Sequence, residues 1–171
     1  MSGLQEFNRL PREDASDRLL KCCGSTRWAE GVAGARPFES FEALLETADR
    51  VWWSLGREDW LEAFRSHPKI GERRAERETG EGATRWSEQE QSGTRGASAE
   101  VMSELAEANR EYEERFGHIF IVCATGKSAD EMLSLLRARL PNDADTELRV
   151  AAEEQRRITH LRLEKSLGSA V

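Results

Sequence analysis

Residues 144–167 read ADTELRVAAEEQRRITHLRLEKSL and form the longest helical pattern in the chain. At 100° per residue, the apolar side chains of this stretch fall on one face of an α-helix. These apolar residues are Leu148, Ala151, Ala152, Ile158 and Leu163. Gln155 and Arg162 fall on the same face, so the pattern predicts a long amphipathic helix with two polar side chains turned inward.

Arg162 on this face has two interpretations. An unpaired buried charge is very costly, so the guanidinium must find an anion or several acceptors. In the first interpretation, Arg162 makes a structural salt bridge or extends its charged end to solvent near the helix end. In the second, it binds an anion in a pocket, because the planar guanidinium matches a carboxylate. The helical pattern alone favours the first.

Most of the remaining sequence also has helical periodicity. The segments with this pattern are residues 11–23, 28–33, 40–55, 60–67, 87–90, 101–116 and 128–140. Residues 119–123, IFIVC, are the only strand-like run. A single strand has no partner, so we expect a buried extended segment or a helical turn there. The sequence therefore predicts an all-α fold, with residues 1–171 forming a single-domain bundle of about eight helices.

Residues 71–86, GERRAERETGEGATRW, are charged and contain almost nothing apolar to bury. Connections longer than about 12–15 residues are uncommon and often belong to functional lids or mobile segments. We therefore expect a long charged loop within the predicted domain.

The composition excludes several function classes. The chain has 171 residues, with 25 Lys and Arg against 32 Asp and Glu, and a formal net charge of −7. This charge opposes binding to nucleic acids or to an anionic membrane. The three cysteines form no C-x-x-C motif, so neither a disulfide scaffold nor a thiolate zinc site is expected. The sequence predicts neither a signal peptide nor a membrane span, and we expect a cytoplasmic protein.

His67 and Glu90 are candidates for acid–base chemistry. His67 lies at a helix-to-loop corner in His67-Pro68-Lys69-Ile70-Gly71, and imidazole is a natural general acid or base near neutral pH. The alternative is a capping or surface histidine. Ser87-x-x-Glu90 matches a helix capping box, which explains both residues without any function. The spacing does not distinguish that role from a catalytic carboxylate paired with His67. No metal site is predicted, since the three histidines are scattered and form no H-E-x-x-H motif.

An ordered set of short motifs covers nearly the whole chain. It consists of Phe7-Asn8-Arg9-Leu10-Pro11, Cys22-Cys23-Gly24-Ser25, Trp28-Ala29, Arg36-Pro37-Phe38, Asp59-Trp60-Leu61-Glu62-Ala63-Phe64, His67-Pro68-Lys69-Ile70-Gly71, Ser87-x-x-Glu90-Gln91-x-Gly93, Asn109-x-x-Tyr112-x-x-Arg115-Phe116-Gly117, Phe120-Ile121-Val122-Cys123-Ala124, Glu147-Leu148 and Ile158-Thr159-x-Leu161-Arg162-Leu163. In this order, the set resembles the 2-oxo-4-hydroxy-4-carboxy-5-ureidoimidazoline (OHCU) decarboxylases. The resemblance implies an all-α enzyme, often a homodimer, that uses no metal or organic cofactor.

The resemblance also implies a reaction and a site. The reaction is decarboxylation of OHCU to (S)-allantoin in urate catabolism, with stereospecific protonation. The implied catalytic residues are His67 and Glu90, and the implied substrate-binding residues are Pro68, Ser87, Gln91, Phe120, Ile121, Val122 and Arg162. Arg139 is a second candidate cation, ranked below Arg162. The alternative function is a catalytically inactive helical interaction module of the same fold.

Overall fold

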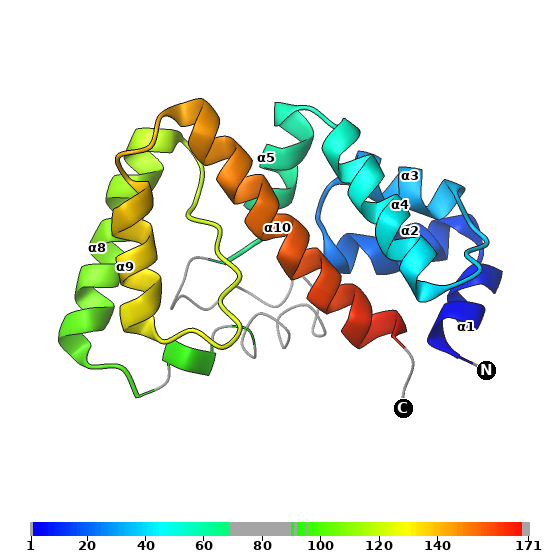
Figure 1. Cartoon of the computed structure of the whole chain (residues 1–171), viewed down its shortest axis with the longest axis horizontal. Helices are drawn as coiled ribbons and strands as arrows, with labels where there is room; N and C mark the ends of the chain where they lie inside the picture. The colour runs from blue at the N-terminus through cyan, green and yellow to red at the C-terminus, as the bar shows by residue number, and fades with distance from the viewer. Residues whose placement is uncertain (1, 69–89, 91, 95, 169–171) are drawn as a thin grey trace. The chain divides into compact units, whose positions relative to one another are not determined.

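The computed structural model describes residues 2–68, 90, 92–94 and 96–168 (Figure 1). These residues contain α-helices and one short 3-10 helix but no β-strand, which confirms the all-α prediction. The helices are α1 (Gly3–Arg9), α2 (Arg12–Cys22), α3 (Thr26–Gly34), α4 (Phe41–Ser54), α5 (Arg57–Arg65), η1 (Ser92–Thr94), α8 (Ala99–Phe116), α9 (Ala129–Arg139) and α10 (Ala144–Leu167).

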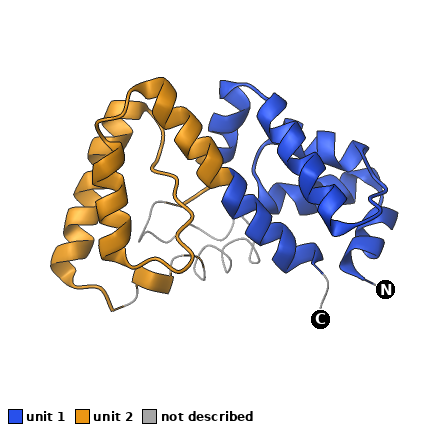
Figure 2. Ribbon diagram, in the orientation of Figure 1, with its two compact units in different colours: residues 1–63, 156–171 blue, residues 64–155 orange. Residues whose placement is uncertain are grey.

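The chain divides into two compact units (Figure 2). Unit 1 comprises Met1–Ala63 and Arg156–Val171, and unit 2 comprises Phe64–Gln155. Helix α10 contributes residues 144–155 to unit 2 and residues 156–167 to unit 1. The single domain over residues 1–171 stays a prediction, and the predicted loop at residues 71–86 lies outside the described residues.

Three helices of unit 1, α1, α3 and α4, begin at serine caps. The Ser25 hydroxyl accepts from the Trp28 N–H at the start of α3, and the Ser40 hydroxyl accepts from the Ala43 N–H at the start of α4. Helix α2 packs against α3, and α3 packs against α4. The largest fully buried side chains of this unit are Phe7, Leu19, Trp28, Leu44, Leu163 and Leu167.

Helix α1 corrects the sequence prediction, which places no helix before residue 11. The helix has only seven residues, and Phe7 is its single buried residue. Its two apolar side chains, Leu4 and Phe7, are too few for a periodic stripe, so the hydrophobic pattern did not reveal it. A capping box starts the helix instead, in which Ser2 and Gln5 satisfy each other's backbone N–H groups.

Unit 2 places a buried extended segment against α8 and α9. The two helices pack together, and their core includes Leu105, Ala108, Tyr112, Phe116, Met132, Leu133 and Leu136, with Phe120, Val122 and Ala124 from the segment. Residues 119–124 form neither strand nor helix, which excludes the helical turn and leaves the other expectation, a segment without a strand partner. Ser128 and Glu131 form a capping box that starts α9, within the helical segment predicted for residues 128–140.

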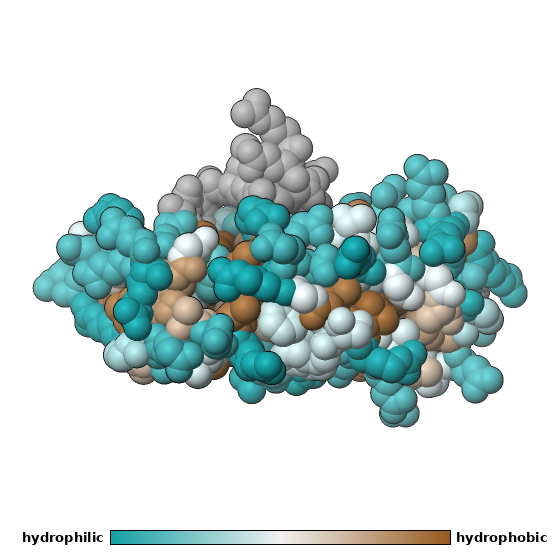
Figure 3. All heavy atoms as spheres, turned by 90° about the horizontal axis from the view of Figure 1, so that it is seen from above, coloured by the Kyte–Doolittle hydropathy of each residue, from teal (hydrophilic) through white to brown (hydrophobic). Residues whose placement is uncertain are grey.

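The visible face in Figure 3 is mostly hydrophilic, with smaller hydrophobic areas between the polar residues. Among the described residues, Trp53 and Leu135 are the large apolar side chains that remain exposed. Scattered exposed apolar residues are normal for a folded protein. None of the described helices is long and apolar enough to cross a membrane.

Candidate active site

His67 lies two residues after the end of α5, and both its backbone and its side chain are bonded. Its backbone N–H donates to the Phe64 carbonyl at 3.2 Å, which closes the turn after the helix. Its ring Nε2 lies 2.6 Å from the side-chain Oε1 of Gln155 on α10. The ring is half-buried, whereas Gln155 is completely buried. The corner predicted from Pro68 therefore presents the imidazole to a buried amide of the same unit.

Glu154, the residue before Gln155, binds the extended segment. Its Oε1 accepts the backbone N–H of Cys123 at 3.2 Å. Two consecutive residues of α10 thus contact two parts of unit 2, the His67 corner and the segment at 119–124. A backbone N–H in a segment without a strand partner needs such an acceptor, because an unsatisfied buried donor is costly.

Glu90 is buried, with 7% of its surface exposed, and carboxylates are seldom buried unless they are paired. The charge of Glu90 influences the pKa of the Cys123 thiol. Burial raises the pKa of Cys123, and the carboxylates of Glu154 and Glu90 also favour the neutral thiol, whereas the Lys127 ammonium opposes them. The Glu90 carboxylate therefore acts on the same segment that the sequence predicts to line the pocket.

Phe120, Ile121 and Val122 are all buried. Arg139 fixes the middle of this segment, because its Nη1 donates to the Ile121 carbonyl at 2.8 Å. Its guanidinium also lies 4.4 Å from the centre of the Phe120 ring. Arg139 and Glu154 thus both bind the backbone of the segment at 119–124, which includes the predicted pocket-lining residues.

The guanidinium of Arg139 is paired with a buried carboxylate. Its Nε donates to Glu147 Oε1 at 2.7 Å, and Tyr112 donates its hydroxyl to the same oxygen at 2.5 Å. Asn142 donates to the other oxygen of Glu147 at 3.0 Å. The second candidate cation of the sequence analysis therefore belongs to a structural network, which neutralises its charge inside unit 2.

Arg162 is buried as the helical pattern predicts, with 5% of its surface exposed. It belongs to unit 1, whereas His67, Glu90 and the segment at 120–122 belong to unit 2. Within unit 1 its charge acts on Cys23. Burial raises the pKa of Cys23 to about 12, and Arg162 partly opposes that increase. Ser87 and Gln91, the other predicted substrate-binding residues, lie outside the described residues.

Gly93 follows Glu90 in the predicted motif, and a steric reason accounts for the glycine. A Cβ atom at this position would overlap the carbonyl oxygen of Lys127. Glycine therefore lets the short helix η1 approach the backbone that leads into α9. The glycine of the motif serves packing next to Glu90 and need not contact a substrate.

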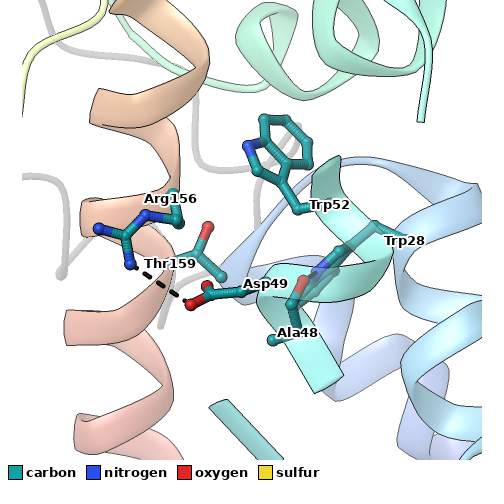
Figure 4. Close-up of a pocket in the computed structure, with 6 residues that line it drawn as sticks. All are labelled: Trp28, Ala48, Asp49, Trp52, Arg156 and Thr159. Carbon is teal, nitrogen blue, oxygen red and sulfur yellow. Dashed lines mark hydrogen bonds and ion pairs between the residues drawn. The ribbon is translucent and has the colours of Figure 1, made fainter. Parts of the chain in front are cut away.

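A narrow pocket in unit 1 contains none of the predicted site residues (Figure 4). Its lining consists of Trp28, Ala48, Asp49, Trp52, Arg156 and Thr159. The Asp49 carboxylate already has two side-chain partners, the Arg156 guanidinium at 3.5 Å and the His160 Nε2 at 2.6 Å. In the part of the chain that the structure describes, no group of three or more His, Cys, Asp or Glu residues could hold a metal ion.

Sequence reasoning missed two contact residues of this region, Gln155 and Glu154. The helical pattern identified Gln155 as a polar residue on an apolar face, but its partner His67 lies 88 positions away in sequence. No sequence signal distinguished Glu154 from the neighbouring Glu153. Contacts of this range depend on tertiary packing, which periodicity does not encode.

Comparison with known proteins identifies a family over most of the chain. Residues 8–164 match the family described as OHCU decarboxylase. A protein of Arabidopsis thaliana named "Uric acid degradation bifunctional protein TTL" is 38% identical over 154 residues, covering 90% of this chain and 47% of that protein. This chain thus spans about half the length of the Arabidopsis relative.

Two further relatives match over nearly their full lengths. A Haloferax volcanii protein named "2-oxo-4-hydroxy-4-carboxy-5-ureidoimidazoline decarboxylase" is 28% identical over 167 residues, covering 97% of this chain and 96% of that protein. The solved structure "Crystal structure of OHCU decarboxylase in the presence of (S)-allantoin" matches with a TM-score of 0.75 and 39% identity. That match covers 87% of this chain and 96% of the solved chain.

Proposed function

Because this chain belongs to the OHCU decarboxylase family, we propose that it converts OHCU to (S)-allantoin in urate degradation. The observation that carries the proposal is the His67 corner. There a half-buried imidazole lies 2.6 Å from a buried amide, within the unit that also holds the buried Glu90. The similar solved structure, described as determined in the presence of (S)-allantoin, supports the choice of product.

The substrate itself supplies the electron sink for this reaction. OHCU carries a carboxylate and a hydroxyl on one carbon, next to a C=N bond. When the C–C bond to the carboxylate breaks, CO2 leaves and the electron pair moves toward the C=N nitrogen, which gains a proton. The resulting enol becomes a ketone when its hydroxyl loses a proton and the adjacent carbon gains one. The roles that remain for the protein are binding, orientation and proton transfer.

We assign the proton transfers to His67, at the substrate hydroxyl or at the carbon that becomes the stereocentre. Glu90 orients the imidazole or a substrate N–H, and Arg162 binds an anionic edge of the substrate. Pro68 and the segment at 120–122 line the pocket, and Ser87 and Gln91 hydrogen-bond the substrate. Protonation from one fixed face yields one enantiomer. A homodimer and a cytoplasmic location remain predictions.

The test is circular dichroism of the product formed from freshly generated OHCU, with and without the protein. Spontaneous decay gives racemic allantoin and no lasting signal. We expect the protein to produce one enantiomer rapidly, and His67→Ala to slow this by about 10²- to 10⁴-fold while keeping its helical content. The matched control is His160→Ala, which removes the other histidine with a 2.6 Å side-chain partner and should keep full activity.

Two outcomes would contradict the proposal. A decay rate and product handedness identical to those in buffer would reject the decarboxylase activity and favour the inactive interaction module. Full stereoselective turnover in folded His67→Ala would leave the activity in place but reject the role of His67.

A further inference from the structure

The side-chain amide of Gln155 lies on the apolar face of α10, completely buried. Its neighbours on that face are Ala151, Ala152 and Ile158, which are buried as well. An apolar residue at this position would avoid the cost of burying an amide, which is large when the amide has no hydrogen bond. One contact that offsets this cost joins Gln155 Oε1 and His67 Nε2 at 2.6 Å.

Both partners of this contact are held in place by their own backbones. Gln155 lies inside a 24-residue helix, and the adjacent Glu154 binds the backbone N–H of Cys123. The backbone of His67 is tied to Phe64, and Pro68 restricts the conformation of the chain at the corner. Because both backbones are restrained, a rotation of the imidazole ring would break its contact with the Gln155 amide.

The chemistry of the amide oxygen fixes the state of the ring. A carbonyl oxygen only accepts, so the proton of the neutral imidazole lies on Nε2, and Nδ1 is the nitrogen with a lone pair. The amide carries no net charge, so it orients the ring without stabilising the imidazolium as a carboxylate would. A ring held in this way can accept a proton at Nδ1 and return it from the same atom.

We propose that Gln155 is a positioning residue, which holds the His67 imidazole as the Nε2–H tautomer and directs Nδ1 to the reacting atoms of the substrate. This inference rests on the proposed function, because it gives the tautomer a purpose in proton transfer. It assigns Gln155 no direct contact with the substrate.

The test uses two variants of the full-length chain. Gln155→Leu removes the acceptor at similar size, and Gln155→Glu keeps an acceptor oxygen but adds a negative charge. Nitrogen-15 NMR of the three histidines reports the tautomer and the imidazole pKa, with His67→Ala identifying the His67 signals. Stereoselective turnover is measured across pH on the same samples. Glu90 and Glu154 stay unchanged throughout, so any shift originates at position 155.

We expect a single Nε2–H tautomer in the unsubstituted protein. In Gln155→Leu we expect a mixture of tautomers and a fall in kcat of about 10- to 100-fold, with KM changing less. In Gln155→Glu we expect the pKa of His67 to rise by about one pH unit, and the limb of the rate profile that reports His67 to move by the same amount. The matched control is Asp49→Asn beside His160, which should change neither the His67 signals nor turnover.

The outcomes separate this inference from the proposed function. Unchanged tautomer, rate profile and turnover in folded Gln155→Leu and Gln155→Glu would overturn the role of Gln155 and leave the decarboxylase activity standing. If Gln155→Leu does not fold, an unmoved pH profile in Gln155→Glu overturns the role by itself. If the unsubstituted protein keeps the Nε2–H tautomer but does not act on OHCU, the proposed function is overturned. The role of Gln155 as a positioning residue for that reaction is then overturned as well.

Discussion

His67 in unit 2 and His160 in unit 1 make contacts of the same length but of different character. Each places Nε2 at 2.6 Å from a side-chain oxygen. The partner of His67 is the neutral, fully buried amide of Gln155. The partner of His160 is the Asp49 carboxylate, whose side chain is 32% exposed and which Arg156 also approaches. Distance alone therefore does not identify a functional histidine, whereas the charge and burial of its partner distinguish the two.

The same contrast extends to the ion pairs of the two units. In unit 2, Arg139 and Glu147 form a pair that is almost completely buried. In unit 1, Arg156 and Asp49 form a pair with both side chains partly in solvent. Exposed pairs contribute about 0–1 kcal/mol, because water and salt screen them. When one partner of a buried pair is removed, the other charge stays buried without compensation, and the protein loses far more stability.

The largest expected effect is therefore that of Glu147→Gln. This change leaves the Arg139 guanidinium without its carboxylate, and we expect the free energy of unfolding to fall by about 3–5 kcal/mol. Asp49→Asn, the matched change in unit 1, should cost less than about 1 kcal/mol. Urea denaturation at pH 7 measures both. Equal losses in the two variants would show that burial does not distinguish these pairs.

A second prediction compares two glycines, Gly93 in unit 2 and Gly56 in unit 1. A Cβ atom at Gly93 would overlap the Lys127 carbonyl, whereas one at Gly56 would meet no atom within 4 Å. Because the backbone at Lys127 would have to move to accommodate a Cβ atom at Gly93, we expect Gly93→Ala to lower the free energy of unfolding by about 1–3 kcal/mol. This is the range measured for overpacked cores. Gly56→Ala should stay within about 0.5 kcal/mol of the unsubstituted protein.

The midpoint of thermal unfolding tests the glycine prediction, if both variants and the parent are measured under one condition. The steric account of Gly93 would be wrong if Gly93→Ala unfolded at the same temperature as Gly56→Ala. A loss of turnover in Gly93→Ala, with helical content retained, would further show that the packing of η1 positions Glu90.

Local signals in the sequence predicted most of the fold, since helices depend on periodicity and caps. Ser40 and Ser128 start helices where expected, and the run at residues 119–123 is extended and buried. Helix α1 was missed because a capping box and two apolar residues, Leu4 and Phe7, produce no stripe. The burial of Gln155 followed from its place on the helix, but its pairing with His67 depends on residues 88 positions apart. The predicted roles of His67, Glu90 and Arg162 rest on family resemblance, since no local pattern separates a catalytic carboxylate from a cap.

The smallest expected effect concerns Tyr112, the only tyrosine of the chain and part of the buried network of unit 2. Burial raises the pKa of Tyr112 above its ordinary value of 10, and the hydrogen bond to Glu147 raises it further, although the nearby Arg139 charge opposes both. The folded protein therefore keeps a proton that the unfolded chain loses above pH 10. The stability from this group is complete below pH 10 and falls as pH rises further, by at most about 1.4 kcal/mol per pH unit.

The ultraviolet absorbance of the phenolate, followed together with circular dichroism, measures this titration directly. We expect phenolate to form only as the helices unfold, and Tyr112→Phe to remove that part of the alkaline loss of stability. Phenolate formation near pH 10 in a protein with intact helices would mean that water reaches the Tyr112 hydroxyl. The network around Glu147 would then resemble the solvent-exposed Asp49 pair of unit 1, and the contrast between the two units would not hold at this position.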